Sequence, residues 1–288
     1  DKNGMAYELY SNIKPNPTIE NVQTGVQAFK DAGTDYLISI GGGSSMDTAK
    51  AIGIIINNPE HEDVVSLEGA VDTKNKSVPI FAVPTTAGTA AEVTINYVIT
   101  DAAKNRKMVC VDPHDIPVVA FIDSEMMSSM PKGLTAATGM DALTHAIEAY
   151  IGNSTTKKTR EYALKATKLI FENIYKVYED GNDLKARSNM LDAAYYAGHA
   201  FTVSYVGYVH AIAHSLGGKY NIAHGLANAT LLDVVLKQYG DSVHKKLYEM
   251  ALYCGICNAK DSYKVGAERF IEQITLMKLC STFFLNAF

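Results

Sequence analysis

The chain has 288 residues, of which 47% are hydrophobic and 20% are charged, a composition typical of a globular chain with room for two domains. A net charge of −5 gives no broad basic field, so nucleic acid and anionic membranes are excluded as the main partners and a small molecule is expected. No apolar run reaches the length of a membrane span and no secretory signal is evident, so we expect a cytoplasmic protein.

The first half of the chain alternates helical segments with short β-branched runs. The helical spacing predicts helices over residues 18–33 and 45–56. The runs "TDYLISI", "SVPIFAV" and "IPVVAFID" end at residues 40, 83 and 123, and they are typical of parallel strands buried on both faces. A hairpin is expected where "INYVIT" and "RKMVCVD" flank the turn "DAAKN".

After residue 134 the sequence is helical almost throughout. It therefore predicts an α/β domain with a parallel sheet over residues 1–134, followed by an all-α domain over 135–288.

Two loops rich in glycine and threonine directly follow predicted strands. "GGGSS" (41–45) opens a helix, where backbone N–H groups and the helix dipole favour a phosphate. "TTAGT" (85–89) follows its strand in the same way. Glycine loops can simply turn a corner, but two at one sheet edge favour a bound dinucleotide pyrophosphate.

Three histidines lie close together in "HAIAHSLGGKYNIAH". His210 and His214 are four residues apart on one helical face, "LGG" (216–218) predicts the helix end, and His224 follows a short loop. Asp141 and His145 share a face of an earlier apolar helix in the same way. One such histidine alone is more often a core residue, but the set predicts a site for Fe²⁺ or Zn²⁺, between which ligand softness does not choose.

The four cysteines are too few and too scattered for a disulfide framework. "CGIC" (254–257) resembles a redox or zinc half-site, but it follows a helix and has no second pair. Reduced thiols are therefore predicted for all four, which are Cys110, Cys254, Cys257 and Cys280.

Five long motifs resemble the iron-containing (group III) alcohol dehydrogenase family in order and spacing. They are "IGGGSSMDTAKAIGIIINNPE", "PTTAGTAAEVTINYVITD", "VDPHDIPVVAFID", "ATGMDALTHAIEAYI" and "HAIAHSLGGKYNIAHG". The resemblance implies a dehydroquinate synthase-like fold whose N- and C-terminal segments are shorter here than in the family.

The resemblance also implies the roles of individual residues. The metal ligands are Asp141, His145, His210 and His224, and the catalytic histidine beside the nicotinamide and substrate is His214. The positions that contact the cofactor are Asn16, Gly42, Gly43, Ser44, Asp47, Thr85, Thr86, Thr89 and Lys107. His214 is expected to relay a proton, and its alternative role is to orient a ligand.

The predicted function is a metal-dependent oxidoreductase that interconverts a small primary alcohol or diol and its aldehyde with NAD(H), with NADP(H) not excluded. We also expect a homo-oligomer, most simply a dimer. Two alternatives stay open: a metal enzyme of the glycerol dehydrogenase or dehydroquinate synthase type, and an inactive shortened remnant that acts only in association.

Overall fold

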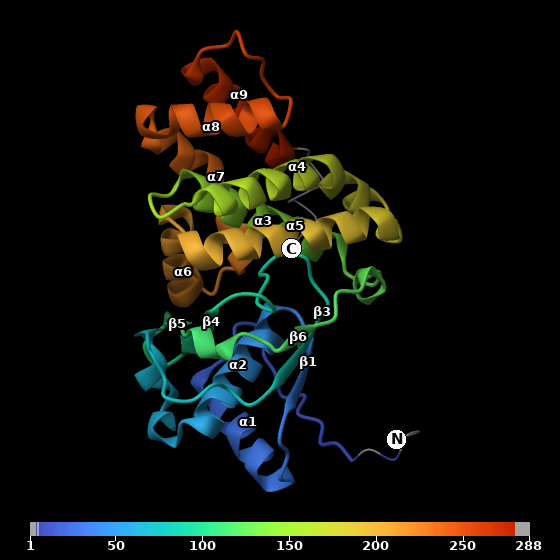
Figure 1. The fold of residues 1–288 in the computed structure, drawn as a ribbon, viewed down its shortest axis with the longest axis vertical. Helices are drawn as coiled ribbons and strands as arrows, with labels where there is room; N and C mark the ends of the chain where they lie inside the picture. The colour runs from blue at the N-terminus through green and yellow to red at the C-terminus, as the bar shows by residue number, and fades with distance from the viewer. Residues whose placement is uncertain (1–3, 5, 280–288) are drawn as a thin grey trace. The chain divides into compact units, whose positions relative to one another are not determined.

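The computed structural model describes residues 4 and 6–279, which separate into two compact units (Figure 1). The first unit takes in the described residues up to Pro84 together with Ala91–Ile122, and the second takes in Thr85–Ala90 and the described residues from Asp123 onward. These ranges differ from the predicted domains 1–134 and 135–288 because residues 85–90 and 123–134 pack with the helices. Ala87 and Met127 are buried in the helical core and draw their segments into it.

The first unit begins with two helices that the sequence predicted. Helix α1 (Ile19–Ala32) is capped by Thr18 and ends at Gly33, whose φ of 61° lies in the left-handed region that glycine adopts readily. Helix α2 (Gly43–Asn57) starts two residues after β1 (Leu37–Gly41), so the glycine-rich loop joins strand to helix as predicted.

The strands of this unit form two small sheets. In the first sheet, β1 pairs in parallel with β3 (Ile80–Pro84), in register from Leu37 opposite Ile80 to Gly41 opposite Pro84, and β3 pairs in parallel with β6 (Val119–Ala120). In the second sheet, β5 (Arg106–Val111) pairs with β4 (Asn96–Asp101) as the predicted antiparallel hairpin and with β2 (Gly69–Ala70) in parallel. Short 3₁₀ helices lie over residues 59–61, 64–67 and 113–115 of this unit, and a further one lies over residues 124–127 of the second unit.

The prediction that the parallel strands are buried on both faces is wrong for β1. Ile38 and Ile40 are each 59% exposed, and Phe121, just after β6, is 55% exposed. Helix α2 packs against β1 and β3 on one side, while these side chains point to the other. An apolar run shows that a strand favours burial, but it does not show what covers each face.

The second unit is helical, and its core lies between long helices. Helix α3 runs through the middle of this core, packed against α4, α5 and α7, and α8 packs against α9 (Figure 1). The helices are α3 (Lys132–Ile151), α4 (Lys157–Glu179), α5 (Leu184–Ser204), α6 (Tyr208–Tyr220), α7 (His224–Tyr239), α8 (Asp241–Tyr253) and α9 (Tyr263–Leu279). Within residues 4 and 6–279, no helix combines the length and apolar character needed to cross a membrane.

The described cysteines are free thiols, as predicted. Cys110 and Cys257 are buried and Cys254 is half-buried, and burial raises the pKa of Cys254 to about 12. A thiol with so high a pKa is a poor nucleophile near neutral pH. Cys280 lies outside the described residues.

Candidate metal centre

Helix α3 carries the first side chains of the site. Asp141 and His145 lie one turn apart on the same face, and both are almost completely buried. Small residues let neighbouring chain approach this helix: a Cβ on Gly225, at the start of α7, would come within 2.5 Å of the carbonyl oxygen of Ala137. The first turn of α7 is therefore held directly against α3.

Helices α6 and α7 supply the other histidines. The predicted helix end at "LGG" is wrong, because α6 continues through Gly217 and Gly218 to Tyr220 and ends at Asn221, whose φ is 54°. Asparagine tolerates this left-handed conformation and so replaces glycine as the stop. The chain then turns back, and His224 is the first residue of α7.

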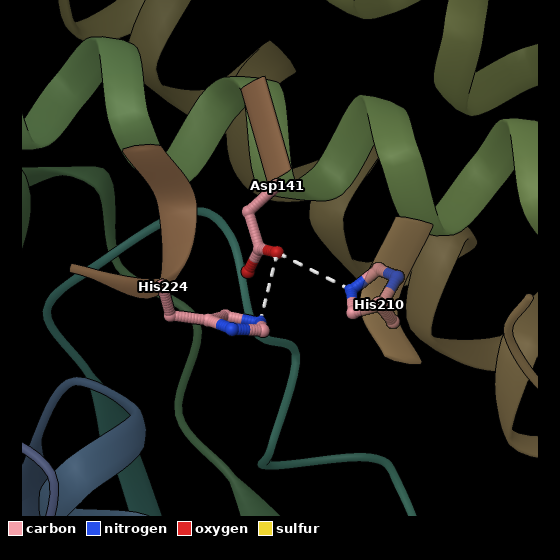
Figure 2. Close-up of side chains that lie close together, drawn as sticks. All are labelled: Asp141, His210 and His224. Atoms are coloured by element: carbon pink, nitrogen blue, oxygen red, sulfur yellow. Dashed lines mark ion pairs between the residues drawn. The ribbon is translucent and has the colours of Figure 1, made fainter. Parts of the chain in front are cut away.

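Asp141, His210 and His224 converge on one point, although they come from three different helices. Figure 2 shows the Asp141 carboxylate directed between the two imidazoles. Its Oδ1 atom lies 3.5 Å from Nε2 of His210 and 3.3 Å from Nε2 of His224. One potential ligand atom from each residue lies within 4.8 Å of the other two.

His145 lies beside this cluster without belonging to it. Its ring stacks on that of His210 at a centroid distance of 4.5 Å, and on Phe201 at 4.1 Å. Its buried Nδ1 has no hydrogen-bond partner among the described residues. Burial lowers the pKa of His145 to about 3, so the ring is neutral and keeps a free lone pair.

His214 lies against both histidines of the cluster. Its ring centroid is 6.1 Å from that of His210 and 5.1 Å from that of His224, and its side chain is half-buried. The structure thus gathers all five predicted site residues of the helical unit into one region, with three of them at its centre.

Two further residues that the sequence analysis missed contact the cluster. Asn228, one turn after His224 and fully buried, directs Nδ2 at Oδ1 of Asp141 at 2.7 Å. Glu148, two turns after Asp141, lies 2.7 Å from Nδ1 of His210. Both continue the helical face of a predicted ligand, so the i, i+4 and i, i+7 spacings were the available signals.

The charges of the cluster are mutually stabilising. Burial would raise the pKa of Asp141, but the surrounding imidazoles of His145, His224 and His210 outweigh it and hold this pKa well below its usual range. Burial would likewise lower the pKa of His210, but hydrogen bonds to Asp141 and Glu148 raise it to about 9. The site therefore keeps an anionic carboxylate in a buried place, which only a cationic partner makes favourable.

These residues fit a divalent transition metal ion. One carboxylate oxygen and imidazole nitrogens are the donor set that suits Fe²⁺ or Zn²⁺. The buried Nδ1 of His145 and Oδ1 of Asn228 have no hydrogen-bond partner within the described chain, and such orphaned acceptors are costly without a ligand.

The predicted cofactor positions fall in both units. In the α/β unit, Nζ of Lys107 donates to Oδ1 of Asn16 at 2.9 Å, which joins two positions 91 residues apart. Gly42 is the N-cap of α2, and Gly43 and Ser44 open its first turn, where N–H groups are available to an anion. The neighbouring Gly41 has a φ of 150°, and an added Cβ would collide with the Ser45 side chain.

The remaining cofactor positions have more varied surroundings. Burial raises the pKa of Asp47 to about 7, although Lys50 and Lys107 oppose the shift. Thr85, Thr86 and Thr89 lie on the loop after β3, which packs with the helical unit because Gly88 lies against the backbone of Thr138. Since β1 and β3 end side by side at Gly41 and Pro84, the two predicted phosphate loops start from adjacent positions, as expected.

The α/β unit and the helical unit with its buried carboxylate and imidazole cluster both match a known class of oxidoreductases. The family model described as "Iron-containing alcohol dehydrogenase" matches residues 1–124. The family model described as "Fe-containing alcohol dehydrogenase family, C-terminal" matches residues 135–279. The chain belongs to the iron-containing alcohol dehydrogenase family.

Individual relatives agree with this assignment. The chain is 52% identical over 256 residues to lactaldehyde reductase of Escherichia coli (strain K12), a match covering 89% of this chain and 66% of that protein. It is 37% identical to an alcohol dehydrogenase from Oenococcus oeni of known structure, with a TM-score of 0.92 and coverage of 96% and 72% of the two chains. It is 29% identical to sulfoacetaldehyde reductase from Bifidobacterium kashiwanohense, solved in complex with NAD⁺, with a TM-score of 0.84 and coverage of 95% and 70%.

Proposed function

We propose that the protein is a metal-dependent oxidoreductase that interconverts a small primary alcohol or diol and its aldehyde with NAD(H). The observation that carries the proposal is the convergence of Asp141, His210 and His224 from three helices, with unpartnered buried acceptor atoms beside them. Similarity to a lactaldehyde reductase and an alcohol dehydrogenase supports the substrate class. Both family descriptions are of iron-containing enzymes, which favours this function over the glycerol dehydrogenase or dehydroquinate synthase type.

The metal would be held by Asp141, His145, His210 and His224, with Fe²⁺ as the expected ion and Zn²⁺ as the alternative. A divalent ion bound there supplies a Lewis acid, and NAD(H) supplies hydride chemistry. The buried Asp141 carboxylate provides the negative charge that favours the ion, and the neutral His145 ring offers a further lone pair.

The cofactor would be held by the loops and side chains described above. The first turn of α2 offers backbone N–H groups to a phosphate, and Lys107 adds a positive charge that is oriented by Asn16. The bound NAD⁺ of the sulfoacetaldehyde reductase supports NAD(H) as the cofactor class. The homo-oligomeric state, with a dimer as its expected form, and the cytoplasmic location stay predictions from the sequence.

His214 would exchange a proton with the substrate oxygen. Its ring lies against both His210 and His224, and His214 is not one of the four residues that we propose as metal ligands. Its side chain keeps some exposure to solvent, which allows it to take up a proton after each turnover.

The function is tested by loading the chain anaerobically with Fe²⁺ and following NADH oxidation in the presence of lactaldehyde and other small aldehydes. We expect about one metal ion per chain and NADH oxidation that depends on it. His214→Gln is expected to keep its metal and to slow aldehyde reduction by roughly a hundredfold, as for loss of a general acid. His199→Gln on α5, where the ring packs on Tyr195, is the matched control. Absence of activity in the metal-loaded wild type would overturn the function, and an unchanged rate in His214→Gln would overturn the proton-transfer role.

A further inference from the structure

Glu148 is a charged side chain in an otherwise apolar part of α3, and its side chain has no exposure to solvent. It lies seven residues after Asp141 and three after His145, which places all three on one face of the helix. An ionised carboxylate this deeply buried is unfavourable unless both oxygens have partners. The partners of Glu148 therefore indicate what it does.

Both oxygens of Glu148 face the start of α6. Oε1 accepts the backbone N–H of Val209 at 2.8 Å, and Oε2 lies 2.7 Å from Nδ1 of His210. The N-cap of α6 is Gly207, which has no side chain to cap the helix, so Glu148 supplies from another helix the acceptor that a capping residue would provide. A Cβ on Gly207 would lie 2.8 Å from Oε1, so the carboxylate occupies space that only glycine leaves.

The contact with His210 determines which imidazole nitrogen carries the proton. An ionised carboxylate only accepts hydrogen bonds, so Nδ1 of His210 must be the donor. In the neutral ring the proton is then on Nδ1, and the lone pair is on Nε2. Nε2 is the atom that faces Asp141 at 3.5 Å in the cluster.

We propose that Glu148 is a positioning residue that holds His210 with its proton on Nδ1, so that the Nε2 lone pair is directed at the metal centre. This inference rests on the proposed metal site and adds to it the residue that prepares one of its ligands. If Glu148 only capped α6, its hydrogen bond from the N–H of Val209 would be sufficient. The second contact, with Nδ1 of His210, needs the positioning role.

Glu148→Gln separates the two roles because glutamine has about the same shape but only one acceptor atom. The site presents two donors, the N–H of Val209 and Nδ1–H of His210, so the amide NH₂ must oppose one of them or force His210 into the other tautomer. Loss of a group that orients a ligand typically weakens metal binding by about 10- to 100-fold. The matched control is Glu249→Gln. The Glu249 carboxylate also accepts a hydrogen bond, from the Tyr150 hydroxyl at 2.8 Å, but it does not contact the cluster.

The measurement is Zn²⁺ affinity in competition with a chelator, together with NMR of the zinc-loaded, histidine ¹⁵N-labelled protein. We expect the Kd of Glu148→Gln to rise by about 10- to 100-fold over wild type and Glu249→Gln, and the downfield Nδ1–H resonance of His210 to move upfield. Gly207→Ala, which crowds Oε1 without changing any charge, is expected to weaken binding in the same direction by a smaller factor.

The outcomes separate this inference from the proposed function. A Kd within twofold of the control for Glu148→Gln, with the resonance in place, would overturn the role of Glu148 while leaving the metal site intact. If Glu148→Gln does not fold, an unchanged Kd in Gly207→Ala would overturn it instead. Failure of the wild type to bind Zn²⁺ would overturn the metal centre, and the inference with it.

Discussion

Each of the two units buries a cluster of ionisable groups, but only the cluster of the α/β unit is built around a lysine. In the α/β unit, the fully buried Nζ of Lys50 lies 3.4 Å from Oδ1 of Asp115 and donates to the carbonyls of Thr94 and Asn96. In the helical unit, Asp141 faces imidazole nitrogens and the amide of Asn228. Lys50 gives the first cluster a fixed cation, although burial still raises the pKa of Asp115 to about 7, while the second cluster depends on protons or a metal ion.

This difference explains why two clusters of similar burial have different chemical uses. Lys50 is committed to a fixed set of oxygens, so the α/β cluster ties α2 to β4 and the 3₁₀ turn at Asp115. Both Asp115 oxygens lack a hydrogen bond but face Lys50, whereas the unpartnered acceptors of His145 and Asn228 in the helical cluster have no lysine beside them and are available to a ligand. A buried carboxylate that faces a lysine of the same chain therefore forms a structural cluster. A buried carboxylate without such a lysine can form a binding site for a cation.

The largest effect is expected from removing the internal cation. Lys50→Met should lower the free energy of unfolding by about 3–5 kcal/mol at pH 8, because it leaves the Asp115 carboxylate buried without its partner. Urea denaturation measures the loss, and Lys74→Met is the control, since its pair with Glu60 is exposed and contributes less than about 1 kcal/mol. Equal effects of the two substitutions would remove the contrast between the clusters.

A metal ion should stabilise the helical unit selectively. Zn²⁺ at a hundred times its Kd should add about 2.7 kcal/mol, measured as hydrogen-exchange protection of α3, α6 and α7. His224→Ala should abolish both binding and protection, while His244→Ala, whose histidine pairs with Asp241 on α8, should keep them. Protection of His224→Ala by Zn²⁺ at wild-type strength would contradict the assignment of the site.

The smallest effect is expected from Asp47→Asn, which mimics the protonated form of a buried acid. Burial raises the folded-state pKa of Asp47 to about 7, above its unfolded value near 4. Stability from this group is therefore fully present below about pH 4 and is lost as the pH rises through 7. By the linkage relation, the variant should gain about 2 kcal/mol over wild type at about pH 5.5, midway through the loss, and little near pH 4. A difference that is the same at both pH values would show that Asp47 does not titrate in this way.

Local patterns were sufficient for the elements and for most of the site. Helical spacing and capping located α1 and α2 within two residues, and the polar turn located the β4–β5 hairpin. The i, i+4 pairs of Asp141 with His145 and of His210 with His214 follow from the geometry of a single helix. They could therefore be predicted from the sequence without knowledge of the tertiary structure.

Features that depend on contacts between distant segments of the chain could not be predicted from local sequence patterns. The pairing of Lys50 with Asp115, and of Glu148 with His210, joins residues 65 and 62 positions apart that no local period relates. The exposed face of β1 at Ile38 and Ile40 was missed for the same reason, since burial of a strand depends on what packs over it. The left-handed stop at Asn221 was missed because two glycines offered an earlier helix end that α6 does not use.

If the site binds a metal ion as proposed, the uneven burial of the three central side chains would set the order in which ligands exchange. His224 is 24% exposed, whereas Asp141 and His210 are each only 3% exposed. A chelator or an incoming ion therefore meets His224 first, and release of that imidazole is the first step of dissociation. In the proposed site, the rate of metal loss would then depend on the first turn of α7, which Gly225 holds against α3. Substitutions there should change residence time more than equilibrium affinity.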